Sequence, residues 1–417
     1  MAASFPTPPR PTLPPSDPPA MELAALTLGI ISFAIAAVAT AAVKRVAPRL
    51  NFVDKPGHRK VHKAPTPLGG GVGIFLAFVL PMLGVLLAVR VLDPAAPRLG
   101  VPAETWAAYL SGARQQTPAA LALLGAAAVL HVMGLVDDKR ALGPYVKLLV
   151  QLGVAIAVVL PFKPLWSLTA LDDEVGAHGA LAVTVSVLWI TAITNAFNFL
   201  DNMDGLSAGI AAVCATSFLI TALSIRQWFV AAALALLIGA LVGFLCFNFP
   251  PASIFMGDAG SLVVGFLLGV LTIRTTYLPP GTAFGAGWYA VFAPVIVLAV
   301  PLYDLVVVSG IRLRAGKSPF VGDTNHLSHR LVRRGMSKRT AVLCIWLLTA
   351  ATSVAAVVLP HAGTPLAAFL LFAQTFLILG VVMLLEQHPL PVGAEGAGAA
   401  AVQPAGWRPS PEGATAP

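Results

Sequence analysis

The stretch NAFNFLDNMDGL carries an amide and two carboxylates, Asn198, Asp201 and Asp204, at intervals of three residues. Residues three apart on a helix are neighbours, so a continuous helix would place these side chains on one face. Two carboxylates at that separation repel each other, and the repulsion grows where water is scarce. A metal ion or a cationic side chain must then offset it. The alternative is that Asp201 and Asp204 cap the next helix, with Gly205 easing the turn.

Two further acidic motifs lie at the ends of apolar runs. Asp137 and Asp138 are adjacent, and adjacent helical residues point about 100° apart, so at most one of them faces a given ligand. A solvated charge cluster at a helix end is the alternative for this pair. In FMGDAGS, Asp258 lies between Gly257 and Gly260, where a flexible backbone can approach a diphosphate closely. No lysine follows in the spacing of a P-loop.

Basic side chains gather in two stretches. In NHLSHRLVRRG, His326 and His329 are three residues apart, and Arg330 follows them. Two histidines at this spacing can hold zinc, but imidazole among arginines suits phosphate better. In HRKVHKAPTPLGGG, Lys63 ends a second basic cluster, for which contact with the membrane surface is the alternative. Phosphate binding is the favoured interpretation of the histidine stretch.

The composition is that of an integral membrane protein. Mean hydropathy is +0.84, and 57% of residues are hydrophobic and 11% charged, against about 25% charged in soluble domains. A helix needs roughly 20 apolar residues to cross a bilayer. Such runs lie near 22–43, 68–89, 117–136, 145–162, 178–196, 205–225, 227–247, 258–276, 286–310, 340–360 and 363–385. The predicted fold class is therefore all-α, a polytopic membrane protein with about 11 transmembrane helices and cytoplasmic active-site loops.

The chain divides into three predicted regions. Residues 1–20 form a proline-rich disordered tail, residues 21–386 the transmembrane domain, and residues 387–417 a second disordered tail. Lysine and arginine concentrate in the connections after the first and ninth runs. The positive-inside rule then places the N-terminus outside, and the odd-numbered connections and the C-terminus in the cytoplasm. The net charge of +8 is explained by contact with anionic membrane lipid and requires no nucleic acid.

Every acidic motif falls on an odd-numbered connection. Asp137 and Asp138 lie on the third, the Asn198 stretch on the fifth, Asp258 on the seventh, and the histidine pair on the ninth. All of them are therefore expected at the cytoplasmic edge of the bilayer. Carboxylates beside a membrane predict a functional site, here for a divalent cation and a phosphorylated substrate.

The motifs, taken in order, resemble those of the polyprenyl-phosphate N-acetylhexosamine-1-phosphate transferases of glycosyltransferase family 4: DKPGHRKVHKAPTPLGG, GLVDDK, NAFNFLDNMDGL, NFPPASIFMGDAGS and NHLSHR. The resemblance covers residues 45–345 and implies an enzyme of the bacterial inner (plasma) membrane that uses Mg²⁺, with Mn²⁺ as a substitute. It implies transfer of a sugar 1-phosphate from a UDP-sugar to undecaprenyl phosphate, with release of UMP. The HRKVH run resembles the branch that uses UDP-N-acetylglucosamine and begins the synthesis of surface polysaccharide or teichoic acid.

The same resemblance implies roles for individual residues. Asn198 and Asp258 would hold the metal. The implied catalytic group comprises Asp137, Asp138, Asp201 and Asp204. Asp137 would be the base or orienting group of this set, and Asp201 and Asp204 would bind substrate or support the site. The implied substrate contacts are Lys63, Asn248, Phe255, His326, His329 and Arg330, with Asn248 and Phe255 matching positions that contact uracil.

One position departs from the family pattern. The ninth connection of the family usually reads His-x-His-His, whereas this chain has Ser328 in place of the middle histidine. A serine can donate one hydrogen bond but carries no charge. The departure keeps a catalytically inactive scaffold open as an interpretation. The sequence leaves monomer and homodimer open as well.

Two other functions and two mechanisms stay open. A phospho-N-acetylmuramoyl-pentapeptide transferase of peptidoglycan synthesis is the alternative within the family. A membrane transporter is the alternative from another class, because Asp304 lies inside an apolar run. For the transferase, direct attack of the lipid phosphate is favoured, since a phosphate monoester with a second pKa near 6 is already largely anionic at neutral pH. A double displacement would instead make an aspartate the covalent nucleophile.

Overall fold

The computed structural model describes residues 20–54, 65–98, 101–162, 179–275, 292–318, 323–362 and 364–387. Lys63 lies outside the described residues, as do the two predicted tails apart from one residue of each.

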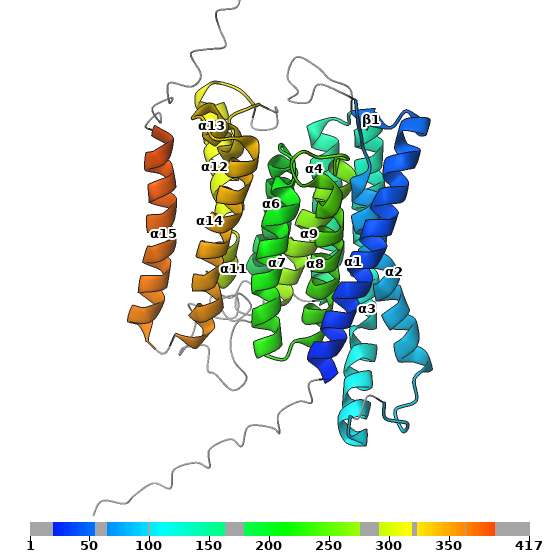
Figure 1. The fold of residues 1–417 in the computed structure, drawn as a ribbon. Helices are drawn as coiled ribbons and strands as arrows, with labels where there is room; N and C mark the ends of the chain where they lie inside the picture. Colours follow the sequence, from blue (N-terminus) through cyan, green and yellow to red (C-terminus); the bar gives the residue numbers. More distant parts are fainter. Residues whose placement is uncertain are drawn as a thin grey trace, which may run out of the picture.

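The described residues form a bundle of helices (Figure 1). The helices are α1 (Ala20–Val46), α2 (Gly70–Val91), α3 (Ala103–Lys139), α4 (Pro144–Phe162), α6 (Ala180–Leu200), α7 (Leu206–Ser224), α8 (Trp228–Asn248), α9 (Asp258–Arg274), α11 (Ala293–Val297), α12 (Ala299–Arg314), α13 (Leu327–Arg333), α14 (Lys338–Val358) and α15 (Pro365–Gln387). The remaining described elements are the short helices η1 (Ala47–Leu50) and η3 (Leu359–His361) and an antiparallel strand pair, β1 (Val53–Asp54) with β2 (Thr66–Pro67).

Most of the predicted apolar runs become long helices. Among the described residues, nine helices have at least 18 residues and are apolar enough to cross a membrane. The other two predicted runs correspond to α9, with 17 residues, and to α11 and α12, with 5 and 16 residues. The all-α membrane fold is therefore confirmed, whereas the count of about 11 spans is not established. The predicted break near Arg226 is present, between α7 and α8.

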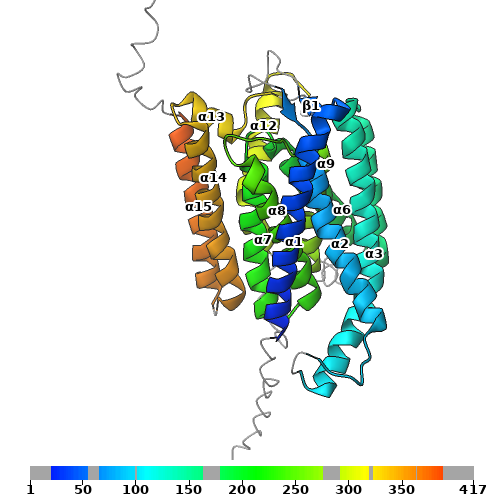
Figure 2. The same ribbon diagram turned by 45° about the vertical axis from the view of Figure 1, so that its right-hand side comes forward.

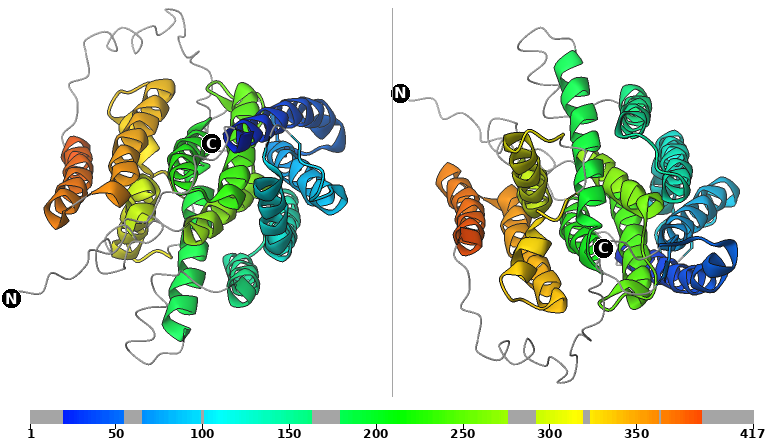
Figure 3. Two further views of the ribbon diagram at one scale, coloured as in Figure 1. Left: turned by 90° about the horizontal axis from the view of Figure 1, so that it is seen from below. Right: turned by 90° about the horizontal axis from the view of Figure 1, so that it is seen from above.

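Helix α9 is the buried centre of the bundle. Fourteen of its 17 residues are buried, and it contacts α2, α3, α6, α7 and α8. A helix that is apolar on all sides is either enclosed by other elements or faces lipid, and the neighbours of α9 enclose it. Seen along the bundle axis, α14 and α15 lie on one side and α1 to α4 on the other (Figure 3). The acidic motif that begins α9 is consequently held by the helices around it.

Glycines let two neighbouring helices touch the first turn of α9. A Cβ atom on Gly71 of α2 would lie 2.3 Å from the backbone nitrogen of Gly260. A Cβ atom on Gly134 of α3 would lie 2.4 Å from the backbone nitrogen of Ala259. Side chains larger than hydrogen at these positions would displace the backbone of α9. The two glycines therefore fix where Asp258 begins its helix.

We predict that Gly134→Ala destabilises the protein by about 1–3 kcal/mol, because overpacking against a backbone cannot be relieved by a rotamer change. The measurement is thermal unfolding in detergent. Gly125→Ala is the matched control on the same helix, since a Cβ atom there meets nothing within 4 Å. Equal melting temperatures for the two variants would contradict the close approach.

Candidate active site

Hydrogen bonds join the motif-bearing connections at one end of the bundle, where β1 and α13 lie (Figures 1 and 2). The Phe255 N–H donates to the Pro67 carbonyl at 2.9 Å, and the Gly70 N–H donates to the Phe255 carbonyl at 2.9 Å. These bonds tie the first connection to the seventh. The Ser328 hydroxyl donates to Asn202 Oδ1 at 2.6 Å and ties the ninth connection to the fifth. The predicted convergence of these connections is confirmed.

The carboxylate of Asp138 holds the first turn of α9. Its Oδ1 accepts the Asp258 N–H at 2.8 Å and its Oδ2 accepts the Ala259 N–H at 3.2 Å. Gly257 has φ 74°, and a Cβ atom on it would lie 2.4 Å from Asp138 Oδ2. Only glycine fits this position, because both the backbone angle and the carboxylate exclude a side chain. Asp138 thus acts as a helix cap supplied by another helix rather than as a solvated charge.

The cap changes what the FMGDAGS backbone can do. The N–H groups of Asp258 and Ala259 donate to Asp138, and those of Gly260 and Ser261 donate to the Gly257 carbonyl at 3.0 Å. All four donors of the first turn are therefore used within the protein. A diphosphate near this turn must be bound by side chains or a cation instead of these amides.

Lys147, in the first turns of α4, joins two carboxylates. Its Nζ lies 3.1 Å from Asp137 Oδ2 and 2.8 Å from Asp258 Oδ2. The other oxygen of Asp137 accepts the Leu142 N–H at 2.6 Å. Asp137 therefore contacts the Lys147 side chain, whereas Asp138 contacts the backbone at the start of α9, and both lie beside Asp258. That at most one of these two acids faces a ligand stays a prediction. Lys147 is not among the site residues predicted from the sequence, although a lysine just inside an apolar run, ten residues after Asp137, is a signal of a functional role.

The two predicted metal ligands are in contact. Asn198 Nδ2 donates to Asp258 Oδ1 at 2.9 Å and to Ser261 Oγ at 2.9 Å. The carboxylate of Asp258 is therefore held on one side by an amide and on the other by Lys147. The amide nitrogen of Asn198 is occupied by these bonds, which leaves its Oδ1 as the atom suited to a metal ion.

The prediction that Asn198, Asp201 and Asp204 share one helical face is wrong. Helix α6 ends at Leu200, and Asp201 has φ −78° and ψ 42°, outside the helical region. Side chains of Asp and Asn compete for backbone groups and favour turns, so DNMDG leaves the helix. The capping alternative is also wrong, since α7 begins after Gly205 without a side-chain cap. Asp204 Oδ2 instead accepts the Ala252 N–H at 3.0 Å.

Asp201 lies in a strongly anionic environment. Burial, followed by repulsion from the Asp258 and Asp138 carboxylates, raises the pKa of Asp201 to about 8. The positive charge of Lys147 therefore does not neutralise the whole group of acids. This group of Asp137, Asp138, Asp201 and Asp258 is called the acidic cluster below.

The acidic cluster suits a cation that arrives with its substrate. Among the described residues, no three His, Cys, Asp or Glu side chains converge as a preformed metal site. Mg²⁺ commonly uses one or two protein carboxylates and takes its other ligands from phosphates and water. The donor atoms of Asp258 and Asn198, in an under-neutralised acidic environment, fit that mode of binding.

Asn248 is part of the scaffold of the site. Its side chain is 3% exposed. Its Oδ1 accepts the Gly205 N–H at 2.9 Å, and its Nδ2 donates to the Ile254 carbonyl at 2.9 Å. Asn248 therefore braces the fifth connection against the seventh. Phe255, the other residue predicted to contact uracil, is half-buried and lies three residues before Asp258.

The two histidines of the ninth connection differ. His326 is 4% exposed, and its Nδ1 lies 2.7 Å from Asp304 Oδ2. Its Nε2 lies 3.4 Å from Arg312 Nη2. His329 is half-buried, and its ring makes no hydrogen bond to another described residue. Burial first, and then the basic side chains around it, lower the pKa of His329.

Arg330 points to the last helix. Its Nε and Nη2 lie 3.0 and 2.8 Å from Glu386 Oε1 on α15, and its Nη1 donates to the Asn325 carbonyl. The Tyr303 hydroxyl donates to the other oxygen of Glu386 at 3.0 Å. The predicted substrate contact of Arg330 stays a prediction, and the structure gives this side chain a role in joining α13 to α15.

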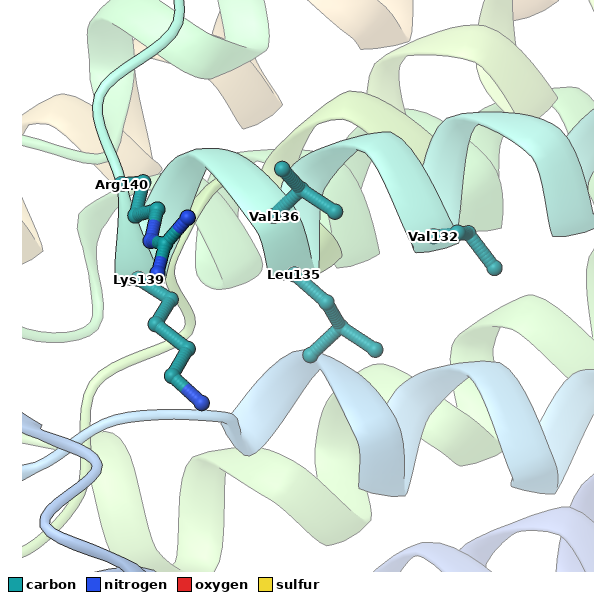
Figure 4. A pocket seen from close by; sticks show the side chains of 5 residues that line it. All are labelled: Val132, Leu135, Val136, Lys139 and Arg140. Carbon is teal, nitrogen blue, oxygen red and sulfur yellow. The ribbon is translucent and has the colours of Figure 1, made fainter.

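A shallow groove of about 330 Å³ follows the exposed face of α3 towards the site (Figure 4). It is lined by Val132, Leu135, Val136, Lys139 and Arg140. Val132 and Val136 are 59% and 46% exposed. The groove is apolar along the helix, and its two cations lie at the end of α3 that carries the acidic cluster.

The chain matches known proteins over most of its length. The family model described as glycosyl transferase family 4 matches residues 120–276. A Bacillus subtilis (strain 168) protein named probable undecaprenyl-phosphate N-acetylglucosaminyl 1-phosphate transferase is 33% identical over 332 residues, 79% of this chain and 83% of that protein. A decaprenyl-phosphate N-acetylglucosaminephosphotransferase of Mycobacterium leprae (strain TN) is 34% identical, covering 72% and 75%. The undecaprenyl-phosphate alpha-N-acetylglucosaminyl 1-phosphate transferase of Escherichia coli (strain K12) is 28% identical, covering 74% and 76%.

We predict that Lys147→Gln destabilises the protein by about 1–3 kcal/mol, because it leaves Asp137 and Asp258 without their shared cation. Thermal unfolding in detergent without divalent cations is the measurement. Lys317→Gln is the control, since Lys317 is exposed and its side chain makes no ion pair with a described residue. An unchanged melting temperature for Lys147→Gln would show that the ion pairs contribute nothing.

Proposed function

The chain belongs to glycosyl transferase family 4, among the polyprenyl-phosphate N-acetylglucosamine 1-phosphate transferases, and on this basis we propose that it transfers N-acetylglucosamine 1-phosphate from UDP-N-acetylglucosamine to undecaprenyl phosphate and releases UMP. The observation that carries the proposal is the acidic cluster with Lys147 at the start of α9. The cluster places carboxylates that can bind a cation, together with the ammonium group of Lys147, at one end of a membrane bundle. A reaction at a diphosphate needs such cationic groups.

The arrangement of the helices supports a lipid acceptor and a cytoplasmic site. Helix α1 begins at the end of the bundle opposite the site, and α15 ends on the same side as the site (Figure 1). We place this side in the cytoplasm of a bacterial inner membrane, because the basic connections lie there. An exposed apolar groove that ends in Lys139 and Arg140 suits an acyl or prenyl chain with an anionic head group.

The residues of the site have distinct roles in the proposed reaction. Asp258, together with Asn198 Oδ1, would hold Mg²⁺, or Mn²⁺ in its place, and the bound ion would supply positive charge to the diphosphate. Lys147 offers a second cation at the same place. Asp138 holds Asp258 in position through the backbone of α9. Asp137 Oδ2 accepts from Lys147 and its Oδ1 accepts the Leu142 N–H, so this carboxylate would orient Lys147.

We favour direct transfer. An oxygen of the lipid phosphate attacks the β-phosphorus of the UDP-sugar, the bond from that phosphorus to the bridging oxygen breaks, and UMP leaves with the electron pair. The attacking oxygen is already anionic at neutral pH, because the second pKa of a phosphate monoester is near 6. A general base therefore contributes little. Catalysis then depends on positioning and on neutralising charge, for which Lys147 and a cation held by Asp258 and Asn198 would serve.

A transport function has less support. Asp304, the acid inside an apolar run on which a transport function was based, makes hydrogen bonds to His326 and to the Leu327 N–H. Both of its oxygens are therefore used inside the protein. A pentapeptide-bearing donor remains the alternative within the family, and the curated relatives named above favour the simpler amino sugar.

We predict that membranes containing the protein, undecaprenyl phosphate and Mg²⁺ form lipid-linked product and UMP from UDP-N-acetylglucosamine, in a panel of labelled UDP-sugars. Asp258→Asn should lower turnover by about 100-fold or more, since it removes charge from the reacting centre. Asp93→Asn, at the other end of the bundle, is the control.

Absence of product with every UDP-sugar would overturn the proposal. A second arm separates the mechanisms: enzyme without lipid should not exchange labelled UMP into the UDP-sugar. Exchange without lipid would instead support a covalent enzyme intermediate.

A further inference from the structure

The start of α13 is clamped by a carboxylate that the proposed reaction does not use. Asp304 on α12 is 0% exposed. Its Oδ2 lies 2.7 Å from His326 Nδ1, and its Oδ1 accepts the Leu327 N–H at 2.7 Å. One carboxylate therefore binds both the imidazole before α13 and the first N–H group of that helix. Such a pair of bonds fixes the direction in which the helix leaves the chain.

The second nitrogen of His326 is also occupied. Arg312, 2% exposed, lies with Nη2 3.4 Å from His326 Nε2. Asp323 holds the guanidinium through two bonds of 3.1 and 3.2 Å, and Phe199 lies 5.1 Å beneath it. A guanidinium can only donate, so Nε2 accepts and Nδ1 carries the proton given to Asp304. This tautomer leaves His326 no nitrogen for a phosphate.

The other polar side chains near the start of α13 are held in the same way, with one exception. Ser328 is 1% exposed and bonded to Asn202, and Arg330 is bonded to Glu386. His329 is the exception among the described residues of this group, because its ring is partly exposed and makes no hydrogen bond to them. Its ring centroid lies 6.5 Å from that of His326.

We infer that Asp304 is a positioning residue that acts through His326, and that His329 is the imidazole of this motif that contacts an anionic group of the substrate. The inference rests on the proposed function for its substrate, a sugar nucleotide diphosphate. The two histidines of the motif therefore have different roles. His326 holds the start of α13 in place inside the protein, and His329 contacts the substrate in the position that this helix gives it.

The test compares Asp304→Asn, His326→Gln, their double variant and His329→Gln, with exposed His361→Gln as control. Melting temperature in detergent and the KM and kcat for UDP-N-acetylglucosamine are measured for each. His326→Gln should lower the melting temperature by several degrees, whereas His329→Gln should leave it unchanged and lower kcat/KM by about 10- to 100-fold. Asp304→Asn and His326→Gln should each raise KM. The kcat/KM of the double variant should be no lower than that of the more impaired single variant, because the two residues act as one unit.

Two results would overturn the inference. The first is that His326→Gln loses sugar-nucleotide binding without a change in melting temperature, while His329→Gln keeps the wild-type KM and kcat. The second is that the fold-losses of kcat/KM caused by Asp304→Asn and His326→Gln multiply in the double variant, as they do for independent residues. If Asp304→Asn does not fold, the two histidine variants still show which imidazole holds α13 and which contacts the substrate. If the wild-type protein transfers no sugar phosphate, the proposed function fails, while the difference in melting temperature between the histidine variants still tests which one is internal.

Discussion

The hydrogen bonds from the Asp258 and Ala259 N–H groups to the Asp138 carboxylate fix the start of α9, on which the acidic cluster is built. They hold the beginning of α9 against α3, in a space that exists because Gly134 and Gly257 carry no side chain. A buried helix start without such acceptors would leave unpaired donors at considerable cost. The same cap places the Asp258 carboxylate within reach of both α4 and α6. Function and stability therefore share one contact.

The acidic cluster is costly in the absence of its ligands. Several carboxylates lie together at one end of the bundle, and among the described residues Lys147 is the cationic side chain that pairs with two of them. Their repulsion, added to burial, raises the pKa of Asp201 to about 8. A site of this kind gains most when a divalent cation arrives, because the ion relieves repulsion that the fold has already imposed. In the proposed reaction, that cation would come with the diphosphate.

The sequence predicts the helices and the grouping of the motifs well, because both follow from local patterns. Apolar runs are long enough to mark α4 and to separate α7 from α8 at Arg226. Counting them also places the acidic and histidine motifs at one end, which the bonds between connections confirm. Local spacing fails where turn chemistry competes with helix formation, as in the segment from Asp201 to Gly205.

Pairings between distant residues could not be predicted in this way. Asp304 and His326 are 22 positions apart, and Asp138 and Asp258 are 120 apart. No helical or turn period connects such pairs. The role of Lys147 could not be predicted for the same reason, since it depends on two acids from other segments, Asp137 and Asp258. A motif can identify the residues of a site, but tertiary contacts decide which of them face the ligand.

We propose that the cation and the diphosphate bind at the acidic cluster at the start of α9. This proposal is tested most directly by an experimental structure with Mn²⁺ and a non-reactive UDP-sugar, in which anomalous scattering locates the ion. We expect a single Mn²⁺ peak in contact with the Asp258 carboxylate and the sugar-nucleotide diphosphate. A peak beside His326 and His329, or a diphosphate bound away from α9, would contradict it.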